Sequence, residues 1–194
     1  MSALVLAASL LRAVLLPFGD LLSTVVFGAC LLAISAREGK AAALPSPASG
    51  GGKFAAAARR GDESLAMGRI AAIMAGLMVG AVLLAPVVTG RLSQRPLADF
   101  WSWAAISAVI ATLEETAIRG ALYRRWSEEA GPAAAIIAGA AVFALIHLPR
   151  YGLAAMPLDA AVGLALGGLR AVTGRVLPCA IAHTIADWGA WFWA

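Results

Sequence analysis

The sequence predicts an all-α membrane protein, a polytopic bundle of about six transmembrane helices. Of the 194 residues, 61% are hydrophobic and only 13% are charged, which lies outside the range of soluble domains. The hydrophobic residues form apolar runs of roughly 17 to 25 residues, the length that a helix needs to cross a bilayer. Small Gly, Ala and Ser residues recur within these runs, so we expect the helices to pack closely.

The N-terminal part is expected to contain two spans joined by a loop. The first span covers residues 14–36, and residues 37–69 then combine Pro, Ser, Gly and charge, which is typical of a flexible loop. The second span covers residues 70–89. A cleaved signal peptide is the alternative for the N-terminus, since Arg12 precedes an apolar stretch. It is disfavoured because no small-residue cleavage site separates that stretch from Arg37.

Four more spans are expected in the C-terminal part. They cover residues 100–123, 132–148, 153–172 and 176–193, with a loop at 124–131 and a turn at 149–152. Pro132 opens its span in the first helical turn, where proline is tolerated. We therefore expect a single membrane domain over residues 1–194, in which residues 1–99 hold the two N-terminal spans and residues 100–193 form a four-helix catalytic core.

The distribution of charge predicts the orientation. Most of the 15 Lys and Arg residues lie on the side of the 37–69 loop, whereas Arg12, Arg91, Arg95 and Arg150 lie on the other. The positive-inside rule then makes the loop cytoplasmic, in an integral multi-pass protein of the bacterial inner membrane. Tryptophan-rich clusters at 100–103 and 188–193 fall together at the outer interface. This topology explains the net charge of +4 without a nucleic-acid partner, and the lipid bilayer is the partner that it implies.

Ionisable residues inside the apolar runs are the candidate site. Such residues are costly in a bilayer and mark functional positions by default. Glu115 and Arg119 are four residues apart and can form an ion pair on one helix face, while Glu114 is rotated by about 100° towards other partners. The alternative is that the two glutamates mark an interfacial helix end with snorkelling arginines. It is disfavoured because at least eight residues of apolar helix would then lie on only one side of that end.

The two histidines of the chain lie in later spans, and each has a neighbour at a spacing of four. Phe143 precedes His147 in FALIH, and His183 precedes Asp187 in HTIAD. A carboxylate one turn from a histidine can fix its tautomer or share a metal ion with it. Each pattern is weak alone, but three of them on three helices of one small bundle indicate a site.

The motifs EETAIRG, FALIH and HTIAD, in that order on successive helices, resemble the three motifs of the CPBP (Abi) family of intramembrane proteases. That family includes the CAAX prenyl proteases and bacteriocin-processing or immunity proteins. The stretch before HTIAD also looks like the family's glycine pattern, in Gly163, Gly167, Thr173 and Gly174. We expect Gly163, Gly167 and Gly168 to permit close approach of helices. The resemblance covers roughly residues 100 to 190.

The resemblance implies a glutamate-dependent endopeptidase. Glu114 matches the glutamate that activates the attacking water, and His147 matches the histidine that helps to hold it. Glu115 and Arg119 match the supporting pair. A carboxylate in an apolar site is also a better base near neutrality, which agrees with this role for Glu114. Phe143, on the helix face of the imidazole, is assigned to substrate binding.

His183 and Asp187 match the positions that stabilise the oxyanion. The last position is often Asn in the prenyl protease branch, and an ionised Asp187 cannot donate a hydrogen bond. Either Asp187 is protonated, or it only orients His183, which is then the donor. The substrate implied is a membrane-anchored or membrane-associated protein.

Two alternatives remain. The resemblance implies catalysis without a cofactor, but Glu114, His147, His183 and Asp187 are also residue types that bind zinc, so a zinc-dependent membrane protease is the minor alternative. Intramembrane Glu, His and Asp also serve proton-linked transporters or non-catalytic binding and immunity proteins. Against a transporter, the spans contain no evident inverted repeat.

Overall fold

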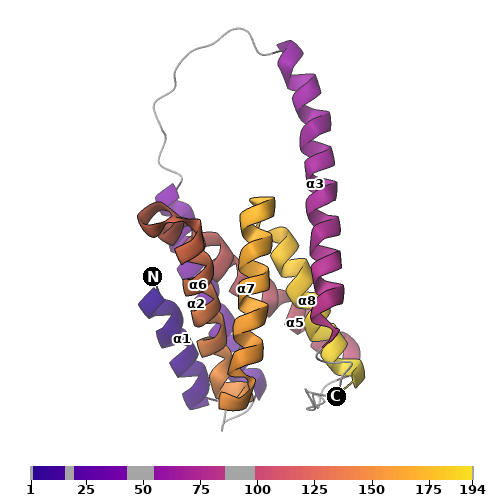
Figure 1. The fold of residues 1–194 in the computed structure, drawn as a ribbon. Coiled ribbons are helices and arrows are strands. Elements are labelled where there is room, and N and C mark those ends of the chain that lie inside the picture. The colour runs from indigo at the N-terminus through magenta and orange to yellow at the C-terminus, as the bar shows by residue number, and fades with distance from the viewer. Residues whose placement is uncertain (1, 16–19, 43–54, 86–98, 194) are drawn as a thin grey trace.

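The protein is described here by a computed structural model that covers residues 2–15, 20–42, 55–85 and 99–193. Every element in these ranges is helical and no strand occurs in them, so the all-α class is confirmed (Figure 1). The elements are α1 (Ser2–Leu15), α2 (Asp20–Ala42), α3 (Ala55–Leu83), α5 (Phe100–Glu115), the π-helix η2 (Thr116–Leu122), α6 (Tyr123–Tyr151), the 3-10 helix η3 (Leu153–Ala155), α7 (Met156–Thr173) and α8 (Leu177–Trp193).

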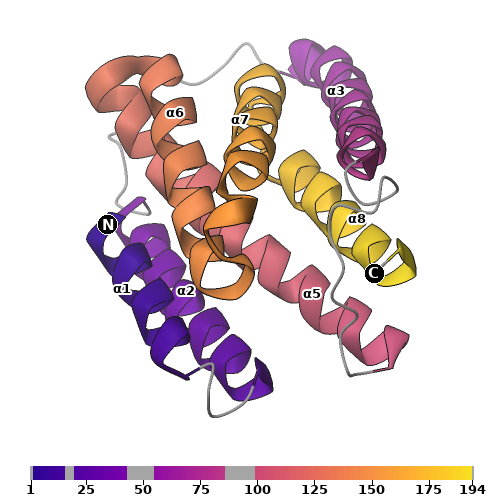
Figure 2. The same cartoon turned by 60° about the horizontal axis from the view of Figure 1, so that its bottom comes forward.

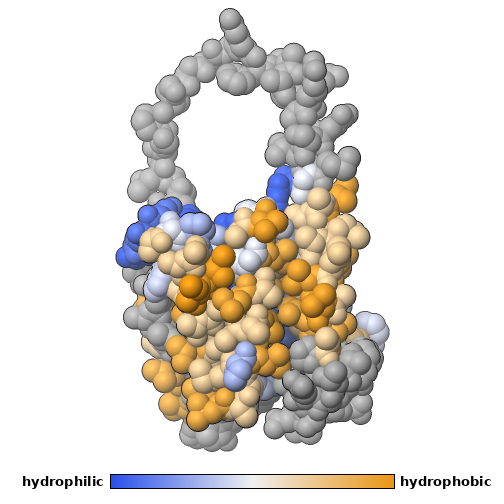
Figure 3. Space-filling model, viewed as in Figure 1, coloured by the Kyte–Doolittle hydropathy of each residue, from blue (hydrophilic) through white to orange (hydrophobic). Residues whose placement is uncertain are grey.

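The surface and the helix lengths suit a bilayer. Two helical stretches, Phe100–Tyr151 and Leu153–Thr173, are long and apolar enough to cross a membrane, and shorter apolar helices cover Ser23–Ile34 and Gly68–Leu83. Figure 3 shows apolar side chains over the body of one face, with hydrophilic residues gathered at the end where α6 begins. This separation is the one that a protein solvated by lipid along its sides requires.

The helices form one bundle around a shared apolar core. Figures 1 and 2 place α1 beside α2, and α3 beside α8, while α6 packs along α7 and α5 packs along α8. Residues from six of these elements meet in the core, among them Val5, Phe27, Ile118, Phe143, Leu166 and Cys179. The N-terminal helices are therefore built into the same packing unit as the segment that carries the motifs.

The structure corrects the prediction at the N-terminus. Residues 2–15 form a separate helix, and the helix that follows covers residues 20–42 rather than 14–36. Residues 37–42 and 55–69 are helical, so the prediction of a flexible loop over 37–69 is wrong there, and residues 43–54 lie outside the described ranges. The segments REGKAA and AAAARRGDESLA are rich in Ala, Arg, Lys and Glu, whose helix propensity outweighs the isolated glycines.

The predicted loop at 124–131 is also wrong, because residues 124–130 continue the helix. Arg125 Nε donates to Glu129 Oε1 at 2.9 Å, a favourable pair at a spacing of four. The helix breaks only at Gly131, whose φ of 86° and ψ of 165° leave the helical region. Pro132 restarts the helix, as predicted.

The remaining spans agree with the sequence to within a few residues. The chain turns at Gly152 (φ 75°) and again at Gly174 (φ 65°), and α7 and α8 occupy the last two predicted spans. The rings of Phe100 and Trp103 lie 5.8 Å and 5.5 Å from that of Trp191, so the two tryptophan-rich clusters lie at one end of the bundle, as predicted. Residues 86–89 of the second predicted span are outside the described part of the chain.

Two of the three glycines expected to permit close helix approach do so. A Cβ on Gly163 would lie 2.7 Å from Ala140 Cα, and one on Gly167 would lie 3.0 Å from Ile136 Cγ2, so both let α7 approach α6. The prediction for Gly168 is wrong, because a Cβ there would meet nothing within 4 Å among the described residues.

Candidate active site

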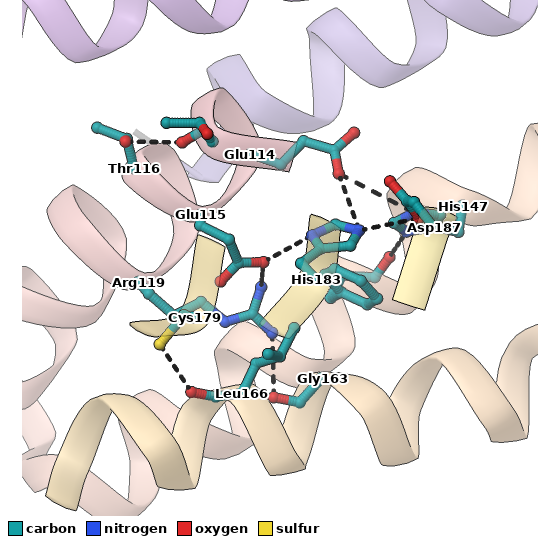
Figure 4. A network of polar contacts seen from close by, with 12 residues as sticks. Glu114, Glu115, Thr116, Arg119, His147, Gly163, Leu166, Cys179, His183 and Asp187 are labelled. Atoms are coloured by element: carbon teal, nitrogen blue, oxygen red, sulfur yellow. Dashed lines mark hydrogen bonds and ion pairs between the residues drawn. The ribbon is translucent and has the colours of Figure 1, made fainter. Parts of the chain in front are cut away.

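Polar side chains from α1, α5, η2, α6 and α8 converge in the middle of the bundle (Figure 4). The two glutamates are adjacent at the end of α5, at the point where the backbone changes from α to π. A π-helical segment is rare and is often found at functional sites. All six sequence-predicted catalytic residues lie in or next to this cluster: Glu114, Glu115, Arg119, His147, His183 and Asp187.

Glu114 is only 3% exposed and faces two imidazoles. Its Oε2 lies 4.0 Å from His147 Nε2 and 3.9 Å from His183 Nε2. Its Oε1 lies 3.7 Å from Nη1 of Arg12, on α1. All of these distances exceed the range of a direct hydrogen bond. Three polar side chains therefore surround the Glu114 carboxylate without forming a direct hydrogen bond to it.

Glu115 points to different partners, as its rotation from Glu114 predicts. Its Oε1 accepts a hydrogen bond from Arg119 Nη1 at 2.9 Å, which confirms the predicted ion pair. The same oxygen lies 3.1 Å from His183 Nδ1. Since a carboxylate oxygen accepts, Nδ1 of His183 carries the proton and Nε2 is left to face Glu114. Glu115 thereby joins Arg119 to the last helix.

Arg119 is held by backbone carbonyls as well as by Glu115. Its Nη2 donates to the carbonyl of Gly163 on α7 at 3.0 Å. Its own carbonyl accepts from Nε of Arg170, also on α7, at 2.9 Å. Both contacts tie η2 to α7. A buried ion pair needs such additional hydrogen bonds to offset the cost of desolvation.

Gly163→Ala is expected to destabilise the protein by about 1–3 kcal/mol, the usual cost of overpacking. The new methyl group would meet the backbone of Ala140, and separating the helices would move the Gly163 carbonyl away from Arg119. Thermal unfolding in detergent micelles would measure the loss.

Gly168→Ala is the matched control, because it lies on the same helix with nothing within 4 Å of the added Cβ among the described residues. Replacement of a helical glycine by alanine there should stabilise the protein by up to about 1 kcal/mol. Equal effects of the two substitutions would contradict the packing role of Gly163.

His147 lies in a column of aromatic rings on α6. Its ring centroid is 4.3 Å from that of Phe143 and 5.7 Å from that of Tyr151, whose ring is nearly parallel to it. Nδ1 lies 2.8 Å from the carbonyl of Phe143, which can only accept, so Nδ1 carries the proton and Nε2 points towards Glu114. Phe143 is buried, and its ring also lies 4.8 Å from the Arg119 guanidinium.

Asp187 lies at the more exposed side of the cluster. Its Oδ1 is 3.7 Å from Nε2 of His183, and its side chain is 32% exposed. The distance is too long for a hydrogen bond. His183 donates its orienting hydrogen bond to Glu115 instead, which differs from the expectation that the carboxylate one turn away accepts it.

Two residues of the cluster were missed by the sequence interpretation. Arg12 was read as a charge of the outer side or of a signal peptide, but it is buried against Glu114. No local pattern marks it, because its partner is far away in the sequence. Tyr151 could have been found, since it continues the spacing of four from Phe143 and His147.

Three of the residues could hold a metal ion. Glu114, His147 and His183 each offer one ligand atom, and these atoms lie within 4.8 Å of one another. Two histidines and a glutamate are a donor set that catalytic zinc accepts. Asp187, the fourth member of the predicted zinc alternative, is not in this group.

Acidic and imidazole groups are buried together among apolar helices here, and in membrane proteins such buried ionisable groups mark functional sites. Residues 96–189, just under half of the chain, match the family model described as Rce1-like, the type II CAAX prenyl endopeptidases. The resemblance to the CPBP family is thus confirmed. The family consists of integral membrane proteases, which supports a CAAX-type intramembrane protease. No similar curated protein and no similar solved structure was found.

Proposed function

We propose that the protein is an intramembrane endopeptidase that hydrolyses a peptide bond in a membrane-anchored or membrane-associated protein. Glu114 and His147 hold and activate the attacking water. The observation that carries this proposal is the spacing around Glu114, whose Oε2 lies 4.0 Å and 3.9 Å from the two imidazole Nε2 atoms. Polar atoms at such a distance are too far apart for a direct hydrogen bond but close enough to share one water molecule.

The protonation pattern supports a division of labour. Because Nδ1 of His147 donates to the Phe143 carbonyl, its Nε2 can accept a hydrogen bond from the water. Glu114 then takes the water proton as general base while the oxygen attacks the peptide carbonyl, and it passes that proton to the leaving amine nitrogen when the C–N bond breaks. The ring of His183 is surrounded by Glu114, Glu115 and Asp187, and these carboxylates stabilise its doubly protonated form. In that form Nε2 donates to the oxyanion that develops.

The proposal also includes the predicted roles of Phe143 and Asp187 and the predicted membrane topology. Phe143 binds substrate through the aromatic column, and Asp187 lies at the exposed side of the cluster, beside His183. Residues 1–194 form one domain of about six spans in the bacterial inner membrane, with residues 37–69 on the cytoplasmic side. The substrate is a membrane-anchored or membrane-associated protein, whether or not it is prenylated.

The direct test compares cells that carry the wild-type protein with cells that carry Glu114→Ala. We expect one or more small membrane-anchored proteins to accumulate uncleaved in the variant cells, as detected by mass spectrometry of their termini. The purified wild-type enzyme should then cleave such a protein in detergent micelles. A membrane proteome with unchanged termini, together with charge-dependent uptake in proteoliposomes, would favour a proton-linked transporter instead.

A zinc-dependent protease is the second candidate, favoured by the three ligand atoms around Glu114. The donor set fits zinc, which when bound would supply a more acidic water. However, the Arg12 guanidinium already lies 3.7 Å from the Glu114 carboxylate, and a second cation there would be repelled. We therefore favour the metal-free reaction.

Removal of metal is expected to leave the rate unchanged. Protein dialysed against a strong chelator should keep its activity, and metal analysis by mass spectrometry should find less than one zinc ion per chain. Loss of activity on chelation, restored by added zinc, would support the zinc enzyme instead.

A further inference from the structure

Arg12 is a buried cation that comes from outside the family segment. It lies on α1, far before residue 96, and yet it is only 7% exposed. Its guanidinium lies 3.7 Å from Glu114 and stands over the ring of Phe27, on α2, with 4.9 Å between the guanidinium carbon and the ring centroid. A permanently charged group is placed in an apolar bundle only if a partner there offsets the cost.

The charges around the two glutamates show which partner this is. Glu115 is already neutralised by Arg119 in a 2.9 Å ion pair. Glu114 has no such close contact, and the two histidines near it carry charge only when protonated. Arginine remains charged at any physiological pH. Arg12 is therefore the fixed positive charge beside Glu114.

The contact between Arg12 and Glu114 is a charge–charge interaction without a direct hydrogen bond. No direct hydrogen bond joins the two groups at 3.7 Å, and Nε of Arg12 has no hydrogen-bond partner within the described ranges. The carboxylate oxygens thus stay available to a water molecule. A close bidentate pair would instead occupy the lone pairs that a general base uses.

We infer that Arg12 is a positioning residue of the active site, whose fixed charge compensates the negative charge of the buried Glu114 carboxylate. This inference rests on the proposed function of Glu114. It makes the N-terminal helix part of the machinery, although the family match covers only residues 96–189. The other charged or titratable groups that surround Glu114 are Glu115, Arg119, His147, His183 and Asp187.

The test replaces Arg12 with Met, which keeps an apolar side chain of similar length and removes only the charge. A carboxylate without a nearby cation binds a proton more readily, so the acid limb of the pH–rate profile should move to higher pH by about one unit or more. At neutral pH we expect kcat to fall roughly tenfold and to recover as the pH rises. KM should change little. Arg12→Lys keeps the charge and should keep the wild-type acid limb.

A second readout does not depend on peptidase activity. The carboxylic-acid C=O stretch of Glu114 can be assigned by infrared difference spectroscopy against Glu114→Gln. In Arg12→Met this band should persist to higher pH than in the wild type. If the wild-type protein never cleaves a substrate, the proposed function fails, whereas the infrared titration still decides the role of Arg12.

Arg125→Met is the matched control, because it removes an Arg–Glu pair whose side chains are about 60% exposed, at 59% and 61%. It should change neither the pH profile nor the infrared band. If Arg12→Met does not fold, Arg12→Gln offers a polar replacement for the same two measurements. A folded, uncharged variant with the wild-type acid limb and the wild-type infrared titration would overturn the inference.

Discussion

Glu114→Gln is expected to lower kcat for peptide-bond cleavage by roughly 10²–10⁴-fold, the usual contribution of a general base. The amide has nearly the same shape as the carboxylate, so the side chain should still lie between the two imidazoles. It cannot take a proton from the water, because an amide is not a base in this pH range. Cleavage of the substrate found in variant cells, followed with purified protein in detergent micelles, measures the loss.

Glu128→Gln serves as the control, since Glu128 is exposed on α6, outside the cluster. The double variant Glu114→Gln, His147→Ala should be only slightly less active than Glu114→Gln alone, because residues that hold one water act as a unit. A folded Glu114→Gln enzyme with wild-type kcat would exclude Glu114 as the base.

Arg119→Met is expected to destabilise the protein by about 3–5 kcal/mol. The substitution leaves Glu115 charged and without its cation in a position that is completely buried. It also removes the donor to the Gly163 carbonyl, and with it one tie between η2 and α7. Reversible unfolding in mixed micelles with increasing denaturing detergent would measure the change in free energy.

The double variant Glu115→Gln, Arg119→Met removes both charges, so it should regain much of that stability. Its activity should stay low, because His183 would then donate its Nδ1–H to a neutral amide oxygen, which stabilises the doubly protonated imidazole less than the Glu115 carboxylate does. The exposed Arg125–Glu129 pair gives the comparison, since breaking it should cost at most about 1 kcal/mol. Similar losses for Arg119→Met and Arg125→Met would show that the buried pair is not structurally important.

Local sequence patterns were sufficient to predict much of the fold. The apolar runs predicted α5, α7 and α8, and Pro132 predicted where the helix of α6 restarts. Composition misled at 37–69 and 124–131, where glycine and charge suggested loops. The Ala, Arg and Glu residues of these segments continue the helices instead. Propensity summed over a whole segment outweighed its single glycines.

For the site, the sequence by itself determined the parts that depend on helical spacing. Glu115 and Arg119 are four residues apart in the sequence, so a helix places them on one face, where they form an ion pair. Glu114 is next to Glu115 in the sequence, so the helix turns its side chain to a different face, towards the histidines. Spacing also placed Phe143 beneath His147. These relations follow from the geometry of one helix, so they do not require knowledge of the neighbouring helices.

Only the tertiary structure decided which helices meet at Glu114. It brought Arg12 from α1 to within 3.7 Å of Glu114, and it gave the orienting contact of His183 to Glu115 rather than to the nearby Asp187. It also introduced the π-helical segment after Glu115, which no residue pattern signals. Such contacts depend on how helices rotate and pack around a common core, and that arrangement is set by the fit of all side chains together.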